Sequence, residues 1–193
     1  MILIDDQIQE YTPEEIARWT DELPEWRRKQ VLAYKNDMGR RQSLLAYRLL
    51  CQGLREEYGI MEQPTFIYNE HGKPSLALPP TGGDGEGLYF SLSHCKEGVC
   101  CAISDRPVGI DIESASRKIS DSVIRYSMNE GEQTLIRESD DPQRTFLRLW
   151  TQKEAVLKRL GTGIRDDMRD ILSDYAYTIE VRENERYILS VAW

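Results

Sequence analysis

The sequence predicts an α+β protein, because helical and strand patterns follow each other twice along the chain. In each half a strand comes first, helices follow, and a pair of alternating strands closes the unit. The change between the two series falls near residues 104–108, so we call residues 1–105 the first half and residues 106–193 the second half. The chain is long enough to bury one large core or two small ones.

The first half is expected to begin with a strand and three helices. Their expected bounds are a strand over residues 1–8, a helix from Thr12 to Leu23, a second helix opened by Pro24 and a third from Arg40 to Tyr58. Thr12 and Glu15 have the spacing of a capping box, and Gly59 is the residue type that ends helices. These local signals support the helices independently of their packing.

Short alternating strands complete the first half. They are expected over residues 65–68, 88–93 and 99–104, with turns at 69–72 and 96–98 and a glycine-rich loop over 79–87. The loop lacks the GxGxxG and GxxxxGK patterns that cradle nucleotide phosphates. The sequence therefore predicts no nucleotide-binding loop of either kind.

The second half repeats the order of strand, helices and strands. Its expected elements are a strand over residues 108–113, helices over 119–126 and 129–138, a long helix from Asp141 to Gly161, and a hairpin of strands over 175–181 and 186–191. Asn129 and Glu132 have capping-box spacing, and Pro142 suits the first turn of the long helix.

Two carboxylates stand on one face of the strand over 108–113. Because side chains alternate along a strand, Ile110 and Ile112 are expected to face the core, and Asp111 and Glu113 are expected to share the solvent-wet face. Like charges placed this way repel unless a cation or a shared proton lies between them, which favours a hard divalent metal. The alternative is an ordinary half-exposed edge strand, where the same alternation is common.

The long helix carries a second group of charges. Its apolar stripe consists of Phe146, Leu149, Trp150, Leu157 and Leu160. Glu154 and Lys158 lie one turn apart at the border of this stripe, where they could form an ordinary solvent-facing ion pair. Lys153 falls inside the stripe, so its amine needs either room to reach water or an anion to bind.

Composition excludes several classes of function. A net charge of −8 argues against general binding to nucleic acid or to an anionic membrane. Two histidines and four cysteines without a CxxC pair make a zinc site improbable. The start of the chain resembles no signal peptide and no apolar run reaches the length of a membrane span, so a reduced cytoplasmic protein is expected.

One segment reverses the acidic balance. Between Trp26 and Arg48 the basic residues are Arg27, Arg28, Lys29, Lys35, Arg40, Arg41 and Arg48, and they are opposed only by Asp37. This segment is either a solvated helix face or a surface that receives phosphates or an acidic protein.

Ser93 and His94 form an adjacent pair at the end of an expected strand. Neighbouring residues on a strand face opposite ways and no GxSxG elbow surrounds the serine, which argues against a hydrolase. The pair is better suited to hydrogen-bond a bound anion.

Four motifs in order resemble the 4'-phosphopantetheinyl transferases. They are Gly72–Pro74, Phe90–Cys95, Gly109–Glu113 and Trp150–Ala155 with Lys158. The length resembles the single-chain, surfactin-synthetase-activating type of that family. The resemblance implies two similar α+β halves related by a pseudo-twofold, with the active site between them. Cys95 stands where the family commonly has serine or threonine, and Gln30 lies near a place where it often has lysine.

The resemblance also implies a reaction and its residues. The 4'-phosphopantetheine group of coenzyme A would pass to a serine of an apo carrier protein, and 3',5'-ADP would leave. Asp111, Glu113 and Glu154 resemble the ligands of Mg²⁺, or of Mn²⁺ in its place. Glu154 or a metal-bound water would be the base, and Lys158 would meet charge on the leaving phosphate. The expected coenzyme A contacts are Arg27, Arg41, Ser43, Lys73, Ser93, His94, Lys153 and Lys158.

The expected partners follow from the same resemblance. They are coenzyme A and an acyl, polyketide or peptidyl carrier protein, bound by a monomer that contacts neither nucleic acid nor membrane. The sequence does not distinguish the three kinds of carrier. Two other functions remain open, a magnesium-dependent phosphodiesterase that acts on coenzyme A or a nucleotide and a non-catalytic carrier-binding module of the same fold.

Overall fold

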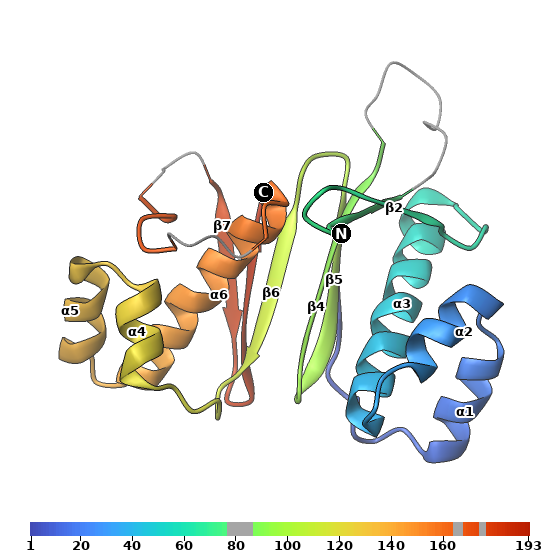
Figure 1. Ribbon diagram of the computed structural model, residues 1–193, viewed down its shortest axis with the longest axis horizontal. Coiled ribbons are helices and arrows are strands. Elements are labelled where there is room, and N and C mark those ends of the chain that lie inside the picture. Colours follow the sequence, from blue (N-terminus) through green and yellow to red (C-terminus); the bar gives the residue numbers. More distant parts are fainter. Residues whose placement is uncertain (77–86, 164–167, 174–176) are drawn as a thin grey trace.

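Two three-stranded antiparallel sheets form the middle of the molecule, and helices cover the outer side of each sheet (Figure 1). The computed structural model describes residues 1–76, 87–163, 168–173 and 177–193. The first sheet has the order β1 (Ile2–Asp5), β5 (Gly98–Ser104), β4 (Tyr89–Cys95), and the second has the order β6 (Gly109–Ser114), β8 (Tyr187–Ala192), β7 (Ile179–Glu183). The predicted α+β class is confirmed.

Within the described residues each half contributes three helices near the expected ranges. They are α1 (Pro13–Asp21), α2 (Glu25–Leu32), α3 (Asp37–Tyr58), α4 (Asp121–Ser127), α5 (Glu130–Glu138) and α6 (Pro142–Leu160). The helix α3 begins at Asp37 rather than at Arg40, because the side chain of Asn36 caps it by accepting from the backbone N–H of Gly39. Thr12 and Asn129 form capping boxes with Glu15 and Glu132. Gly59 ends α3 at a φ of 66°, in the left-handed region that glycine tolerates. Among the described residues, no helix combines the length and apolarity needed to cross a bilayer.

The two halves share one strand order. In each sheet the first strand of the half pairs with the last, and the last pairs with the middle one. In each half the three helices follow the first strand and precede the pair that completes the sheet. This order fits two similar halves, while their relation by a twofold axis stays a prediction.

A small hairpin of β2 (Phe66–Tyr68) and β3 (Pro74–Leu76) is added to the first half. The strand β3 was not expected, because it has three residues and begins with a proline, which cannot donate to a ladder. Residues 79–86 of the expected loop, and residues 175 and 176 of the expected final hairpin, lie outside the described residues.

The strand β6 is buried on both faces, which corrects one expectation. Ile110 and Ile112 pack against Cys100 and Ala102 of β5, as predicted. The carboxylate face is not wet, since α6 packs along β6 and leaves Asp111 only 5% exposed. A buried carboxylate needs compensating partners, so this face is the natural place to look for chemistry.

Close contacts fix α6 on the second sheet. A Cβ atom at Gly109 would lie 1.9 Å from the carbonyl oxygen of Ala155, so only glycine allows the helix this near to β6. The buried hydroxyl groups of Thr151 on α6 and Ser190 on β8 are 2.8 Å apart and hydrogen-bonded. The side chains of α6 therefore face β6 in one defined arrangement.

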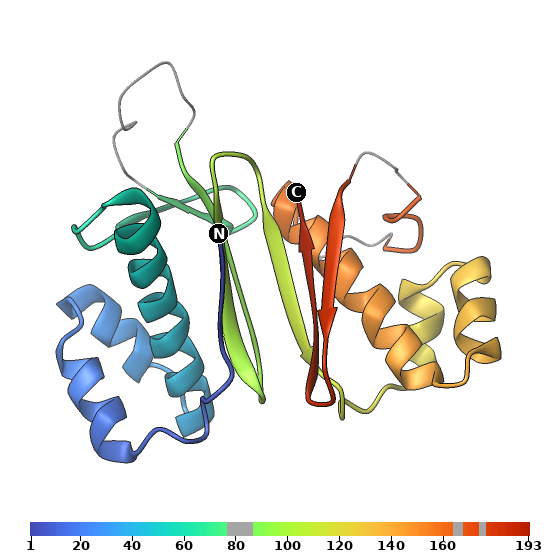
Figure 2. The same ribbon diagram turned by 180° about the vertical axis from the view of Figure 1, so that it is seen from behind.

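The halves meet along β4 and β6, which lie side by side in the middle of the molecule (Figures 1 and 2). Serine hydroxyls bridge the two strands: Ser91 Oγ accepts from the backbone N–H of Ile110 at 3.1 Å, and Ser93 Oγ accepts from that of Ile112 at 3.4 Å. The two sheets are thus joined through side chains of β4.

Candidate functional site

A cavity of about 320 Å³ opens between the two halves, and we call it the central cavity. It is lined by His71, Gly72, Lys73, Pro74, Phe90, Ser91, Leu92, Glu154, Leu157, Lys158, Gly161 and Gly163. Lys73 from the first half and Glu154 and Lys158 from the second half therefore line the same cavity. A larger cavity of about 490 Å³ against α1 and α3 contains none of the candidate metal or coenzyme A residues. Chemistry, rather than volume, singles out the central cavity.

Asp111 is held by two side chains at one of its oxygens. The ammonium nitrogen of Lys158 lies 2.7 Å from Asp111 Oδ1, and the hydroxyl of Ser93 donates to the same oxygen at 2.8 Å. The other oxygen, Oδ2, is buried and has no hydrogen-bond partner among the described residues. Burial alone would lower the pKa of Lys158, but the charge of Asp111 and the hydrogen bond to it outweigh this effect and raise the pKa.

Glu113 is partly neutralised by a residue that the sequence reasoning missed. Arg117 forms an ion pair with Glu113 and lies over the ring of Trp150, 5.0 Å from its centroid. Burial, and then the charge of Asp111, raise the pKa of Glu113 to about 7, against the opposing effect of Arg117. Glu113 and Arg117 are four residues apart, but they lie in a strand and after the turn that follows it rather than in a helix. The helical spacing was therefore no guide to this pair.

Glu154 points toward the same group from α6. Its Oε1 atom is buried and has no hydrogen-bond partner within the described part of the chain. Burial, followed by the charge of Asp111, raises the pKa of Glu154. Lys158 pairs with Asp111 on the neighbouring strand, which argues against the alternative of an ordinary solvent-facing ion pair between Glu154 and Lys158.

The carboxylates of Asp111, Glu113 and Glu154 are the type of oxygen ligand that divalent cations prefer, but their side chains do not converge on one position. In the ranges that the structure describes, no three histidine, cysteine, aspartate or glutamate side chains lie close enough to hold a metal ion together. Asp111 and Glu113 instead pair with Lys158 and Arg117. The unpartnered oxygens of Asp111 and Glu154, and the raised pKa values of Glu113 and Glu154, fit a site with hard oxygen ligands and excess negative charge.

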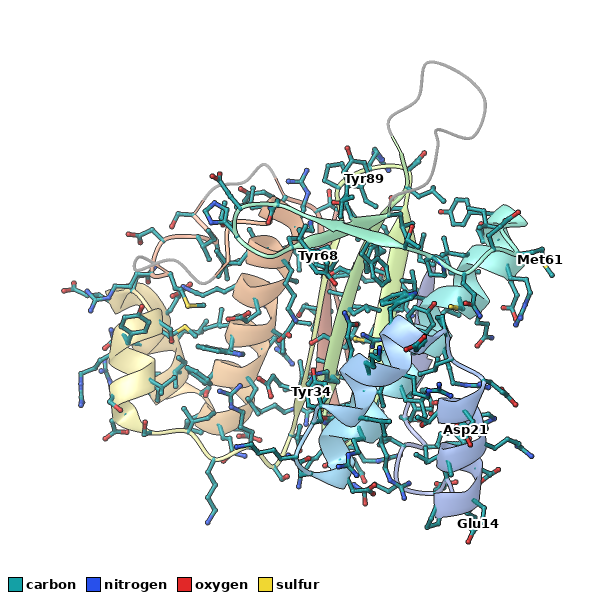
Figure 3. All side chains as sticks on the ribbon, turned by 45° about the vertical axis from the view of Figure 1, so that its right-hand side comes forward. Glu14, Asp21, Tyr34, Met61, Tyr68 and Tyr89 are labelled. Atoms are coloured by element: carbon teal, nitrogen blue, oxygen red, sulfur yellow. The ribbon has the colours of Figure 1, made fainter. Side chains whose placement is uncertain are left out.

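The β2–β3 hairpin, marked by Tyr68 in Figure 3, reaches across to the end of α6. Asn69 donates to the carbonyl oxygen of Gly161 at 3.0 Å, and Lys73 donates to that of Arg159 at 3.1 Å. Burial, and then the charge of Arg159, lower the pKa of Lys73. The predicted turn at residues 69–72 thus places a lysine at the wall of the central cavity.

His94 follows Ser93 on β4. Its side chain keeps part of its surface in water, yet neighbouring protein and then the charge of Lys158 lower the pKa of its imidazole. A second cationic or donor group therefore accompanies Lys158 at this end of the strand, which suits an anionic ligand.

Comparison of the sequence with known proteins finds one family and several relatives. The model of the 4'-phosphopantetheinyl transferase superfamily matches residues 107–190. The chain is 31% identical over 141 residues to the 4'-phosphopantetheinyl transferase gsp of Aneurinibacillus migulanus, covering 72% of this chain and 56% of the relative. It is 34% identical over 128 residues to the transferase psf-1 of Bacillus pumilus, covering 64% and 52%.

The transferase Sfp of Bacillus subtilis (strain 168) is 32% identical over 101 residues, covering 51% of this chain and 42% of the relative. Residues 107–190 are thus similar to the 4'-phosphopantetheinyl transferase superfamily. The resemblance of its motifs to the single-chain, surfactin-synthetase-activating type of 4'-phosphopantetheinyl transferase is confirmed. The chain spans about half the length of the curated relatives that it matches first.

Three residues carried over from the transferase resemblance lie away from the central cavity. Arg27 donates to the carbonyl oxygen of Ser43 at 2.6 Å and to its hydroxyl at 2.9 Å, and burial lowers the pKa of the guanidinium. Arg41 donates to Asp37 at 2.8 Å and to the carbonyl oxygen of Tyr11 at 2.6 Å. These bonds lie within the first half, so a role for Arg27, Arg41 and Ser43 in a transferase site stays a prediction.

Lys153 faces away from the cavity as well. Its side chain is fully buried, 2.7 Å from Glu132 Oε2, and it donates to the carbonyl oxygens of Ser127, Met168 and Arg169 at 2.7 to 2.9 Å. The sequence left this amine either room to reach water or an anion to bind, and in the structure it binds an anion, the carboxylate of Glu132. Lys153 therefore has no place in the coenzyme A site that we propose below.

Proposed function

We propose that the protein transfers the 4'-phosphopantetheine group from coenzyme A to a serine of an apo carrier protein and releases 3',5'-ADP. The observation that carries the proposal is the pair of buried, unpartnered carboxylate oxygens of Asp111 and Glu154 beside the central cavity, with Lys158 next to them. Similarity to the transferase superfamily supports the same reaction. The carboxylates of this arrangement suit a metal cation and a general base, and its ammonium group suits a donor that carries phosphates.

Asp111, Glu113 and Glu154 would hold Mg²⁺, or Mn²⁺ in its place. When bound, such an ion supplies positive charge to the pyrophosphate of coenzyme A. Burial and then the charge of Asp111 raise the pKa of both Glu113 and Glu154, so both carboxylates gain from a cation placed among them. Arg117 and Lys158 provide part of that compensation in the protein alone.

Glu154 and Lys158 would act at opposite ends of the transfer. The raised pKa of Glu154 brings this carboxylate nearer to neutral pH, where a general base is most effective in accepting the proton of the carrier serine. The serine oxygen then bonds to the phosphorus of the phosphopantetheine arm as the bond to the leaving 3',5'-ADP breaks. The ammonium group of Lys158 stabilises the charge that grows on that leaving group.

Coenzyme A would bind with its 3'-phosphate toward Lys73 and His94. Lys73 lines the central cavity, and one of its three N–H donors is used by Arg159, which leaves donors for a phosphate. The lowered pKa of Lys73 is consistent with a cation that gains from an anionic ligand. The carrier would be an acyl, polyketide or peptidyl carrier protein.

The proposal also covers the oligomeric state of the protein and the compartment in which it acts. We propose that the protein acts as a monomer, since both walls of the central cavity come from one chain. We place the reaction in the cytoplasm, because all four cysteines are free thiols and a reducing compartment preserves them.

Mass spectrometry of apo carrier proteins tests the proposed transfer. After incubation with coenzyme A and Mg²⁺, a carrier should gain the mass of one phosphopantetheine group on its serine, and a carrier with that serine replaced by alanine should not. Three carriers, from fatty-acid, polyketide and peptide synthesis, would rank the partners. Release of 3',5'-ADP from coenzyme A without any carrier would instead show a phosphodiesterase, and no product in either case would contradict catalysis.

A further inference from the structure

The hydroxyl of Ser93 lies where β4 of the first half meets β6 and α6 of the second half. It is 2.8 Å from Asp111 Oδ1, 2.8 Å from Lys158 Nζ and 3.4 Å from the backbone nitrogen of Ile112. The side chain belongs to β4 of the first half, while its three partners belong to β6 and α6 of the second. With 7% of its surface exposed, Ser93 is buried among these groups.

We propose that Ser93 is a positioning residue, which orients the carboxylate of Asp111 for a divalent cation and does not contact the 3'-phosphate of coenzyme A. The proposal rests on the proposed function and specifies one of its residues. It replaces the role that the family resemblance implied for this serine.

Counting protons supports this assignment. A serine hydroxyl has one proton to donate and two lone pairs to accept with. Lys158 and the Ile112 N–H can only donate, so both lone pairs of Ser93 are used by them. The carboxylate of Asp111 can only accept, so it takes the proton. A phosphate oxygen also needs a donor, and Ser93 has no second proton to offer.

The consequence for Asp111 is a fixed choice of oxygen. Both Ser93 and Lys158 bind Oδ1, which prevents the carboxylate from rotating freely and leaves Oδ2 as the buried oxygen without a partner. Groups that hydrogen-bond a ligating carboxylate in this way orient it and raise the affinity of the metal site. A residue of the first half thereby controls a metal ligand of the second half.

Metal affinity of the protein alone gives the decisive measurement. Binding of Mn²⁺ is titrated by electron paramagnetic resonance, without coenzyme A or carrier, for native protein and for Ser93→Ala, Ser93→Thr and Ser91→Ala. Loss of the hydroxyl in Ser93→Ala should weaken Mn²⁺ binding about 10- to 100-fold, the usual effect of removing a partner of a metal ligand. Ser93→Thr keeps the hydroxyl and should restore most of the affinity.

Ser91→Ala is the matched control. Ser91 accepts from the Ile110 N–H in the same seam but has no bond to Asp111, so its loss should leave Mn²⁺ affinity within about twofold of native. If Ser93→Ala does not fold, as judged by circular dichroism, Ser93→Cys replaces it, since a thiol keeps the volume and donates weakly.

A second readout separates the two roles of Ser93. The ratio of kcat/KM for coenzyme A to that for dephospho-coenzyme A should be the same in Ser93→Ala as in native protein. Mn²⁺ affinity of Ser93→Ala within about twofold of native overturns the proposal, as does a selective loss of the preference for the 3'-phosphate. The metal titration needs no turnover, so it decides the role of Ser93 even if carrier modification, and with it the proposed function, fails.

Discussion

The ammonium nitrogen of Lys158 lies 2.7 Å from Asp111 Oδ1, so the charge of α6 is paired with a buried strand carboxylate. An exposed pair four residues apart on a helix contributes about half a kcal/mol or less. A pair with a buried member behaves differently, because removing one partner leaves the other desolvated and unpaired. We therefore expect replacement of Lys158 to lower both kcat and the free energy of unfolding.

Lys158→Ala should lower kcat about a hundredfold, the scale of one preorganised electrostatic contact. It should also lower the free energy of unfolding by about 1 to 3 kcal/mol, because Asp111 loses its cation. Transfer kinetics and urea unfolding measure the two effects. Lys29→Ala is the control, since Lys29 forms an exposed pair with Glu25 at 2.7 Å and should change stability by less than about 0.5 kcal/mol. Equal stability losses in the two variants would contradict the buried-pair interpretation.

Glu154→Gln should lower kcat by about 10² to 10⁴, because the amide cannot accept the serine proton. It should weaken Mn²⁺ binding as well, since one ligand charge is lost. Stability should hold or rise, because burial already disfavours the charged form of Glu154. Kinetics, metal titration and thermal melts would be compared, and near-native kcat would rule out Glu154 as the base.

Glu113 should make the metal-free protein less stable as pH rises toward neutrality. The pKa is about 7 in the folded protein and near its ordinary value in the unfolded chain, so between these values the folded state binds more protons. Stability contributed by this group is then full at low pH and lost as pH rises through 7. Urea unfolding from pH 5 to 8 should show a smaller decline for Glu113→Gln, and added Mg²⁺ should reduce the decline in native protein. Parallel curves for both proteins would contradict the assignment.

Lys73→Ala should selectively weaken the use of coenzyme A. A charge-assisted bond to the 3'-phosphate contributes about 1.5 to 3 kcal/mol, which corresponds to about 10- to 150-fold in kcat/KM. Dephospho-coenzyme A lacks that phosphate, so its kcat/KM should change little. Arg106→Ala, at an exposed site in the connection between halves, is the control. Equal discrimination by native protein and Lys73→Ala would place the 3'-phosphate elsewhere.

The basic segment from Trp26 to Arg48 should affect association with an acidic carrier. Reversing Arg28 and Lys29 to glutamate should raise the KM for carrier at low ionic strength, and the effect should fade near 0.15 M salt, where charges are screened within about 8 Å. The same charge change at Arg106 and Arg182, both exposed elsewhere, is the control. A KM that does not respond across the salt series would make the segment a solvated helix face.

Elements with local signals could be predicted from the sequence, because their causes lie within a few residues. The capping boxes at Thr12 and Asn129 and the glycines that end α3 and α6 define helix ends wherever the helices pack. The strand β3 gave no such signal, since Pro74 disfavours a strand and three residues show no periodicity.

The partners of charged side chains could not be predicted in the same way. Helix spacing pointed Lys158 to Glu154, but packing of α6 on β6 offered Asp111, a residue far away in sequence. Lys153 was correctly placed in the apolar stripe, yet its anion came from α5. Ser93 was recognised by its motif, while its contact with Asp111 depends on how the two halves meet. Each choice is set by tertiary packing, which alternation and helical period do not encode.

Gly109 has a consequence for which sequences this fold can tolerate. The residue carries no functional group, yet any side chain there would collide with the backbone of α6 at Ala155 and Arg159, on either side of Lys158 and directly after Glu154. Variation at position 109 is therefore expected to be as restricted in a mutational screen as variation at Asp111. Restricted variation at a position of β6 can therefore result either from a chemical role, as at Asp111, or from a lack of room for a side chain, as at Gly109.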